Sequence, residues 1–312
     1  MQDNMNKNKS KEYVGEIDLM EVINVFLAQS WFMISFTSFF LVIGVTYSLF
    51  LPNTYEAKAI LVSSESSNSI STALNNYSGL AGLAGISLPS PANESNSSKA
   101  IQKIQTLSFF ENNVLPNIFL PDLMALKSWN SKNNSLVYDK NIYDIKSNTW
   151  IKDNSITEAP TPQKSFKKFK SDHISVSENL AKGTYALSIK HQSPFIAKKW
   201  ADLVFEQVNE FYRDKDKSES EKAVEYLNYQ ISTNNLSEVK QVIADLLQQE
   251  TQKLAIIEAK EYYTFDYLDP PAVMEQKSEP NRALISIASA ILGALLSIFI
   301  VLIRHYGFKR KY

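Results

Sequence analysis

Two long uncharged apolar segments lie near the two ends of the chain, and the residues between them are mostly polar. The first segment is Trp31–Leu51 and the second is Ala283–Ile303. Each has about 21 residues, which as a helix would extend roughly 31 Å and cross the hydrocarbon core of a bilayer. The pattern therefore predicts two transmembrane helices that flank one large extramembrane domain at residues 52–282.

Positive charges near both segments indicate the orientation in the membrane. The head of the chain contains Lys7, Lys9 and Lys11, diluted by Glu12, Glu16, Asp18 and Glu21, and the tail contains Arg304, Lys309, Arg310 and Lys311. Short basic flanks remain in the cytoplasm, and two spans place both ends of a chain on one side. We therefore expect a cytoplasmic N-terminal segment at 1–30, a cytoplasmic tail at 304–312, and an outer domain between the spans.

A cleaved signal peptide is the alternative for the first apolar segment. The tripeptide Ala57-Lys58-Ala59 resembles a cleavage site with small residues. However, the apolar run is longer than the core of a signal peptide, and about 30 residues precede it. A membrane span is the better interpretation.

Within the outer domain, short alternating segments predict a mixed helix and sheet base. Residues 55–62 read as a strand, and residues 173–176 and 184–189 read as a hairpin joined by a turn at Gly183. Apolar residues at helical spacing predict a helix over 101–119, and Trp129 and Trp150 are expected to anchor the core. Residues 63–100, rich in serine and asparagine, are either a surface loop or a partner-contact segment around Gly79–Ile86.

A very long helix is predicted after this base. Ser193-Pro194 is a typical N-cap and first-turn pair, and Phe195–Asp269 contains neither proline nor glycine. About 65 residues in one helix would extend roughly 98 Å as a rod, with a possible kink at residues 234–237. A stripe at steps of three and four residues, typical of a coiled coil, forms the expected rod seam: Leu236, Val239, Ile243, Leu246, Glu250, Leu254 and Ile257.

Two further patterns concern the second span, one before it and one inside it. Pro270, Pro271 and Pro280 precede it, and prolines at this place end a helix and favour an extended approach to the membrane. Inside the span, small residues recur at steps of three or four and form a face on which helices can pack closely: Ser286, Ala290, Gly293, Ala294 and Ser297.

The composition excludes several classes of chemistry. The chain has 32 lysines plus arginines against 33 aspartates plus glutamates, which gives no indication of a nucleic-acid partner. Cysteine is absent, and His173, His191 and His305 lack metal-ligand spacing. The sequence contains neither a glycine-rich phosphate loop nor a set for nucleophilic catalysis. We therefore predict no catalytic residue, no cofactor and no metal site.

Five short motifs occur in order along the chain: Glu16-Ile17-Asp18-Leu19, Tyr55-Glu56-Ala57, Leu80-Ala81-Gly82-Leu83-Ala84-Gly85, Lys182-Gly183-Thr184-Tyr185 and Ser193-Pro194. Together they resemble the polysaccharide co-polymerase family, the chain-length determinant (Wzz) proteins of bacterial surface polysaccharide synthesis. The family pattern Pro-x-x-Pro-x-x-x-x-Ser-Pro is kept at Pro271 and Pro280. Met274 stands in place of the inner proline, and Glu279 in place of the serine.

The resemblance implies an α+β fold in which two transmembrane helices flank a periplasmic α/β base with a very long projecting helix. It implies a two-pass protein of the bacterial inner membrane without enzymatic activity. Such a protein would regulate O-antigen-type lipopolysaccharide chain length as a ring-like homo-oligomer. Its partners would be a membrane polysaccharide polymerase, the growing glycan and the bilayer. In this hypothesis the rods associate around the ring, the small-residue face touches the polymerase or a neighbouring subunit, and polar stripes on the rod contact the glycan.

Three other functions fit parts of the pattern. A capsule or exopolysaccharide export co-polymerase would have a similar hairpin topology. A two-span membrane receptor would share the outer domain, but the short basic tail offers no signalling helix. A periplasmic hydrolase on a membrane anchor would need a catalytic set, which the sequence does not suggest.

Overall fold

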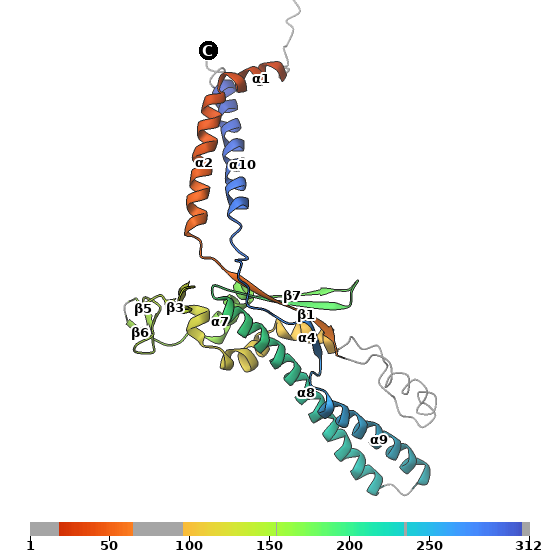
Figure 1. Cartoon of the computed structure of the whole chain (residues 1–312). Helices are drawn as coiled ribbons and strands as arrows, with labels where there is room; N and C mark the ends of the chain where they lie inside the picture. Colours follow the sequence, from red (N-terminus) through yellow and green to blue (C-terminus); the bar gives the residue numbers. More distant parts are fainter. Residues whose placement is uncertain (1–18, 65–95, 154, 234–235, 308–312) are drawn as a thin grey trace, which may run out of the picture. The chain divides into compact units, whose positions relative to one another are not determined.

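The computed structural model describes residues 19–64, 96–153, 155–233 and 236–307, and the chain divides into two compact units (Figure 1). Residues 1–52 and 280–312 form the two-helix unit, and residues 53–279 form the α/β unit. The segment Gly79–Ile86, which the sequence analysis singled out, lies outside the described residues.

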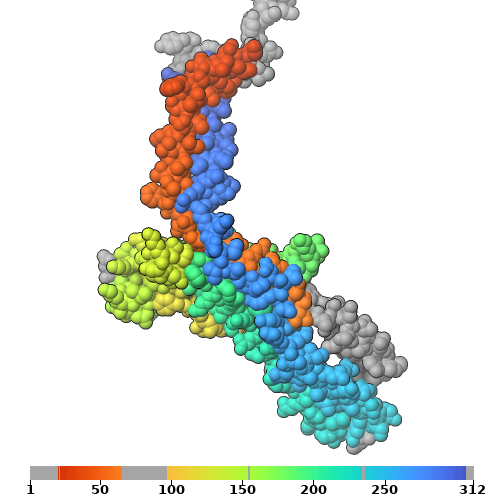
Figure 2. All heavy atoms as spheres, viewed as in Figure 1, coloured from red at the N-terminus to blue at the C-terminus, as the bar shows by residue number. Residues whose placement is uncertain are grey.

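The two-helix unit is built from the apolar segments. Helices α2 (Ser30–Phe50) and α10 (Arg282–Leu302) pack along each other, and Figure 2 shows their side chains in contact over most of their length. The Asn281 side chain accepts a hydrogen bond from Leu284 N at 3.2 Å and caps α10. Helix α1 (Leu19–Ala28) contacts both α2 and α10, and α10 continues into a π-helical turn, η4 (Ile303–Gly307). Both long helices are apolar and long enough to cross a membrane, and most of their surface is exposed.

A four-stranded antiparallel sheet forms the centre of the α/β unit. Its order is β7 (Ile174–Asn179), β8 (Thr184–His191), β1 (Tyr55–Ser63) and β9 (Phe265–Asp269). The predicted strand and hairpin are therefore present, and Gly183 in the β7–β8 turn has φ +61°, which glycine adopts without strain. Along β1, Ala57, Ala59 and Leu61 alternate toward the core, as a sheet with one covered face requires.

Strand β9 lies at the end of the stretch without proline and glycine, where the sequence analysis expected no strand. Phe265 is buried, and Tyr267 stacks on Phe205 with ring centroids 3.7 Å apart. The alternation Phe-Asp-Tyr-Leu-Asp places these two rings on one face of a strand, which helical spacing would not do. This strand could not be predicted from its own sequence, because β9 pairs with β1, about 200 residues earlier.

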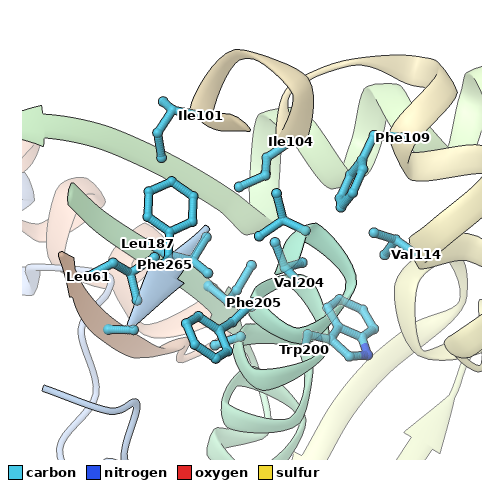
Figure 3. Packing of buried hydrophobic residues seen from close by; sticks show 14 of the residues in the cluster. Leu61, Ile101, Ile104, Phe109, Val114, Leu187, Trp200, Val204, Phe205 and Phe265 are labelled. Carbon is cyan, nitrogen blue, oxygen red and sulfur yellow. The ribbon is translucent and has the colours of Figure 1, made fainter. Parts of the chain in front are cut away.

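The core lies between this sheet and the first half of helix α8 (Pro194–Thr233). Trp200, Val204 and Phe205 of α8 face Leu61, Leu187 and Phe265 of the sheet (Figure 3). The helix begins at Pro194, as predicted, and Ala197 N donates to Ser193 O at 3.0 Å. Because the buried positions of α8 recur at steps of three and four, one side of the helix covers the sheet.

The helix predicted over residues 101–119 is broken into several short pieces. These are α4 (Asn96–Ile104), α5 (Leu107–Phe109), the π-helix η1 (Phe110–Val114) and the 3₁₀ turn η2 (Leu115–Asn117). Thr106 causes the first break, since its Oγ1 accepts a hydrogen bond from Phe109 N at 3.3 Å and starts a new helix. The pieces nevertheless place Ile101, Ile104 and Phe109 in the core (Figure 3).

Several short elements follow: α6 (Leu120–Met124), β2 (Leu126–Asn130), β3 (Ser135–Tyr138), β4 (Tyr143–Asp144), β5 (Thr149–Lys152), β6 (Ser155–Thr157), α7 (Pro162–Lys168) and η3 (Phe169–His173). Leu123 of α6 and Phe169 of η3 belong to the core, whereas β2 to β6 form a peripheral lobe. Trp129 and Trp150 lie here and are half-buried, so the prediction that they anchor the core is wrong. The tryptophan of the core is Trp200, which is 1% exposed. Its place on the helix that covers the sheet, rather than its residue type, decides this role.

The single long rod is also corrected, because the chain folds back into a helical hairpin. Helix α9 (Ser237–Ala259) packs along α8 in the opposite direction, and Lys217 of α8 forms an ion pair with Glu258 of α9. The helix break lies between Thr233 and Ser237, where the sequence suggested a kink. Asparagine and serine have low helix propensity, and an apolar stripe gains more from packing on α8 than from facing water. At 40 residues, α8 extends about 60 Å.

A buried asparagine joins the α8–α9 hairpin to the sheet. Asn209 Oδ1 accepts hydrogen bonds from Thr264 N at 2.7 Å and Phe265 N at 2.9 Å, and its Nδ2 donates to Phe205 O at 3.1 Å. Arg213 Nη2 donates to the carbonyls of Lys260 and Glu261, each at 2.6 Å. These bonds satisfy backbone groups where the chain leaves α9 and enters β9.

Two buried histidines lie at the corner where β8 turns into α8. His191 Nδ1 accepts from Ser193 N at 3.0 Å, so its Nε2 carries the proton and donates to Asp122 O at 3.2 Å. His173 Nδ1 bonds to Lys190 O at 2.7 Å, and both imidazoles lie against Trp200. Burial, with a smaller effect of His173, lowers the pKa of His191 to about 4. Burial also lowers the pKa of His173.

These histidines predict that acid destabilises the α/β unit. Because the pKa of His191 is lower in the folded protein than its usual value of about 6.5, the unfolded chain takes up the proton first as the pH falls. The stabilisation is complete above about pH 6.5 and is lost as the pH approaches about 4, by up to about 3 kcal/mol. We expect the thermal unfolding midpoint to fall between about pH 7.5 and 4.5, and to fall less in His191→Gln. An equal fall in both proteins would contradict this role for His191.

Candidate functional site

The small-residue face of the second apolar helix packs against the first apolar helix of the same chain. Gly293 and Ser297 are buried, and Ser286, Ala290 and Ala294 are half-buried. A Cβ atom on Gly293 would lie 2.7 Å from Phe40 Cβ and 3.3 Å from Thr37 Cα. The close approach of α2 and α10 therefore requires glycine at this position.

Sequence reasoning missed the residues of α2 that complete this contact. Gly44 lies against Ser289, so that a side chain on Gly44 would overlap the Ser289 hydroxyl, and Phe40 covers Gly293. The signal in the sequence for this helix contact was Gly44 itself, a glycine within a run of bulky apolar residues. The serine hydroxyls are satisfied within α10, since Ser286 donates to Arg282 O at 2.9 Å and Ser297 to Ala294 O at 2.7 Å.

The outward sides of α2 and α10 are apolar and exposed. They present large side chains at Phe39, Val42, Leu49, Ile287, Leu295 and Phe299. A surface of this kind is stable in hydrocarbon and unfavourable in water.

The proline segment meets the start of β1 through main-chain hydrogen bonds. Pro271 is buried and Pro270 exposed, and Pro280, half-buried, begins the next unit. Thr54 N donates to Glu279 O at 2.9 Å, and Ser278 N donates to Thr54 O at 2.8 Å. Within the α/β unit, the two ends of residues 53–279 therefore lie next to each other.

Glu279, which departs from the family pattern, forms an ion pair with Lys190 of β8. Lys190 Nζ lies 2.6 Å from Glu279 Oε1, and this hydrogen bond raises the pKa of Lys190. The sequence analysis noted Glu279 only as a substitution for serine. Its partner could not be inferred, because Lys190 lies 89 residues earlier.

The predicted rod seam faces α8 of the same chain. Ile243 and Ile257 are buried, Leu246, Glu250 and Leu254 are half-buried, and Leu236 and Val239 at the start are exposed. The seam therefore closes the hairpin and leaves the other sides of α8 and α9 free to face solvent or partners.

A groove of about 540 Å³ lies beside α8 near the base of the hairpin. Its lining residues are Asn113 of η1 and Gln207, Glu210, Phe211, Asp214 and Lys215 of α8. Gln207 Nε2 donates to Glu210 Oε2 at 2.9 Å, and Lys103 Nζ lies 4.8 Å from the centre of the Phe211 ring. Sequence reasoning missed this groove because η1 approaches α8 only in the folded chain.

The described residues contain no group of three or more histidine, aspartate or glutamate side chains placed to hold a metal ion. His173 and His191 are occupied by backbone hydrogen bonds, and His305 lies in η4 against Tyr306.

One family model matches the N-terminal third of the chain. Residues 15–113 match the model of a family described as Wzz, chain length determinant protein. This match confirms the resemblance that the sequence motifs indicated. No curated protein matches the chain.

Two solved structures are similar to the chain. One is a full-length bacterial polysaccharide co-polymerase, 12% identical, with 94% of this chain and 99% of that chain covered and a TM-score of 0.39. Another is a fragment of WzzB, a polysaccharide co-polymerase from Salmonella Typhimurium, 14% identical, with 73% and 100% covered and a TM-score of 0.30.

The packing of α2 on α10 predicts the effect of filling Gly293. Gly293→Leu would place a side chain where Phe40 and Thr37 lie, and overpacking of this kind costs about 1–3 kcal/mol. We expect a lower thermal unfolding midpoint for the purified protein in detergent. Ala288→Leu, a similar enlargement at an exposed position of α10, is the control and should leave the midpoint unchanged. If both variants melt like the wild type, Gly293 is not at a tight contact.

Proposed function

Because the chain carries a Wzz chain length determinant domain at residues 15–113, we propose that it regulates the length of a bacterial surface polysaccharide. The proposed mode of action is that of a scaffold without catalytic activity or cofactor. The family match is the observation that carries this proposal, and it covers about a third of the chain.

The proposed location is the bacterial inner membrane. Two apolar helices, α2 and α10, are long enough to span a bilayer, and basic residues lie beyond both of them in the sequence. With two spans, both termini lie in the cytoplasm and residues 53–279 lie in the periplasm. The pairing of Thr54 with Glu279 supports a hairpin topology, since the chain enters and leaves the α/β unit at neighbouring points.

The proposed partners are further copies of the chain in a ring-like homo-oligomer, a membrane polysaccharide polymerase and the growing glycan. The small-residue face of α10 and the seam of α9 already pack within one chain. Partners in the bilayer would therefore meet the outward apolar sides of α2 and α10. Partners in the periplasm would meet the exposed sides of the α8–α9 hairpin.

An O-antigen-type polysaccharide is the proposed product of the partner polymerase. A co-polymerase for capsule or exopolysaccharide export would use the same architecture, and so the experiment has to separate the two.

The experiment is a gel of surface polysaccharide from a strain that lacks this protein, with and without the restored gene. We expect deletion to scatter a clustered ladder of chain lengths and restoration to regroup it. An unchanged ladder with a loss of total surface polymer would favour export. No change in either quantity would contradict the proposed function and favour a membrane receptor.

A further inference from the structure

One side of α8 presents aromatic and polar side chains in a continuous row from the groove toward the end of the hairpin. We call this row the outer stripe. Its residues follow one another at steps of three or four, which places them on one helix face: Phe211, Lys215, Ser218, Lys222, Tyr226 and Tyr229. The row spans 19 residues, or about 27 Å along the helix axis.

The outer stripe faces away from α9. On the opposite side of α8, Ser220 is buried and Lys217 pairs with Glu258 of α9. In contrast, Tyr226 and Tyr229 are 61% and 64% exposed, although tyrosine normally buries much of its ring. Packing among the residues that the structure describes therefore does not account for these two aromatic rings.

The groove continues the outer stripe at the base of the hairpin. It adds the amides of Asn113 and Gln207 and the carboxylates of Glu210 and Asp214 to the ring of Phe211. Amides both donate and accept hydrogen bonds, and carboxylates accept them. A sugar ring has an apolar C–H face that packs on an aromatic ring and hydroxyl groups that bond to such polar side chains.

Other occupants fit this surface less well. The cores of protein interfaces are depleted in lysine, glutamate and aspartate, whereas here Lys215 and Lys222 separate the aromatic positions. Carboxylates at Asp214, Glu219 and Glu225 accompany these lysines on or beside the stripe. The mixed charges give no positive surface for a nucleic acid or an anionic membrane.

We propose that the outer stripe and the groove together bind a segment of the nascent polysaccharide in an extended form. The inference rests on the proposed function and names the surface where the glycan is held. Phe211, Tyr226 and Tyr229 contact the faces of sugar rings, and the groove residues bond to hydroxyl groups at the base end. A glycan held along α8 stays next to the protein while the glycan is lengthened. The length of glycan in contact with this surface therefore affects how long the glycan is retained.

The test measures binding of delipidated surface polysaccharide from the same strain to the full-length protein in nanodiscs, by calorimetry. We expect the double variant Tyr226→Ala, Tyr229→Ala to bind about fivefold or more weakly, since two contact surfaces are lost. Asp214→Asn should also weaken binding, through loss of a charged acceptor. The double variant Tyr226→Phe, Tyr229→Phe keeps both rings and should keep most of the affinity. Ile156→Ala, which is exposed in the peripheral lobe, should bind like the wild type.

Three results would overturn the inference. The first is wild-type affinity in the double alanine variant, with an unchanged unfolding midpoint as proof of folding. The second is a change in oligomeric state by native mass spectrometry without a change in glycan binding, which would make the stripe a protein interface. The third is no binding of the polysaccharide to the wild type. The ladder of the deletion strain tests the proposed function separately, so this inference can fail while chain-length regulation stands.

Discussion

The structure of the α/β unit depends on one buried side chain, Asn209, which holds the α8–α9 hairpin to the central sheet. Its amide makes three hydrogen bonds, to Thr264 N, Phe265 N and Phe205 O. Without it, two buried backbone N–H groups at the start of β9 would lose their acceptor, at a cost of about 1–3 kcal/mol each. Because β9 pairs with β1, the same bonds tie the hairpin to the strand that begins the unit.

Internal packing determines which surfaces remain for partners. The apolar stripe of α9 is used against α8, and the small residues of α10 are used against Gly44 and Phe40 of α2. Both features look like sites for association between chains when only the sequence is considered. Since they are occupied within one chain, the surfaces of the described residues that we propose for partners are the outward sides of the apolar helices and the outer stripe of α8. A rigid attachment at Asn209 would hold that stripe in a fixed position on the base.

Local sequence patterns predicted the elements that depend on neighbours in the chain. The apolar runs, the strand at 55–62, the turn at Gly183 and the helix start at Pro194 all follow from local chemistry and are present. The fold-back of the hairpin, strand β9 and the groove were not predicted, because each depends on residues far apart in sequence. Pairs such as Lys190–Glu279 and Asn209–Thr264 leave no periodic signal. Likewise, tryptophan content could not show that Trp200, rather than Trp129 or Trp150, fills the core.

The most direct test of chain-length regulation by the α8–α9 hairpin is the variant Asn209→Ala, which removes the side chain that holds the hairpin to the sheet. The measurement is the surface polysaccharide ladder of a strain that carries this variant at wild-type protein level, together with the unfolding midpoint of the purified protein. The account predicts a lower midpoint and a broadened ladder, because the hairpin is no longer fixed to the sheet. A lower midpoint with an unchanged ladder would contradict the proposal that the α8–α9 hairpin must be fixed to the central sheet to regulate chain length.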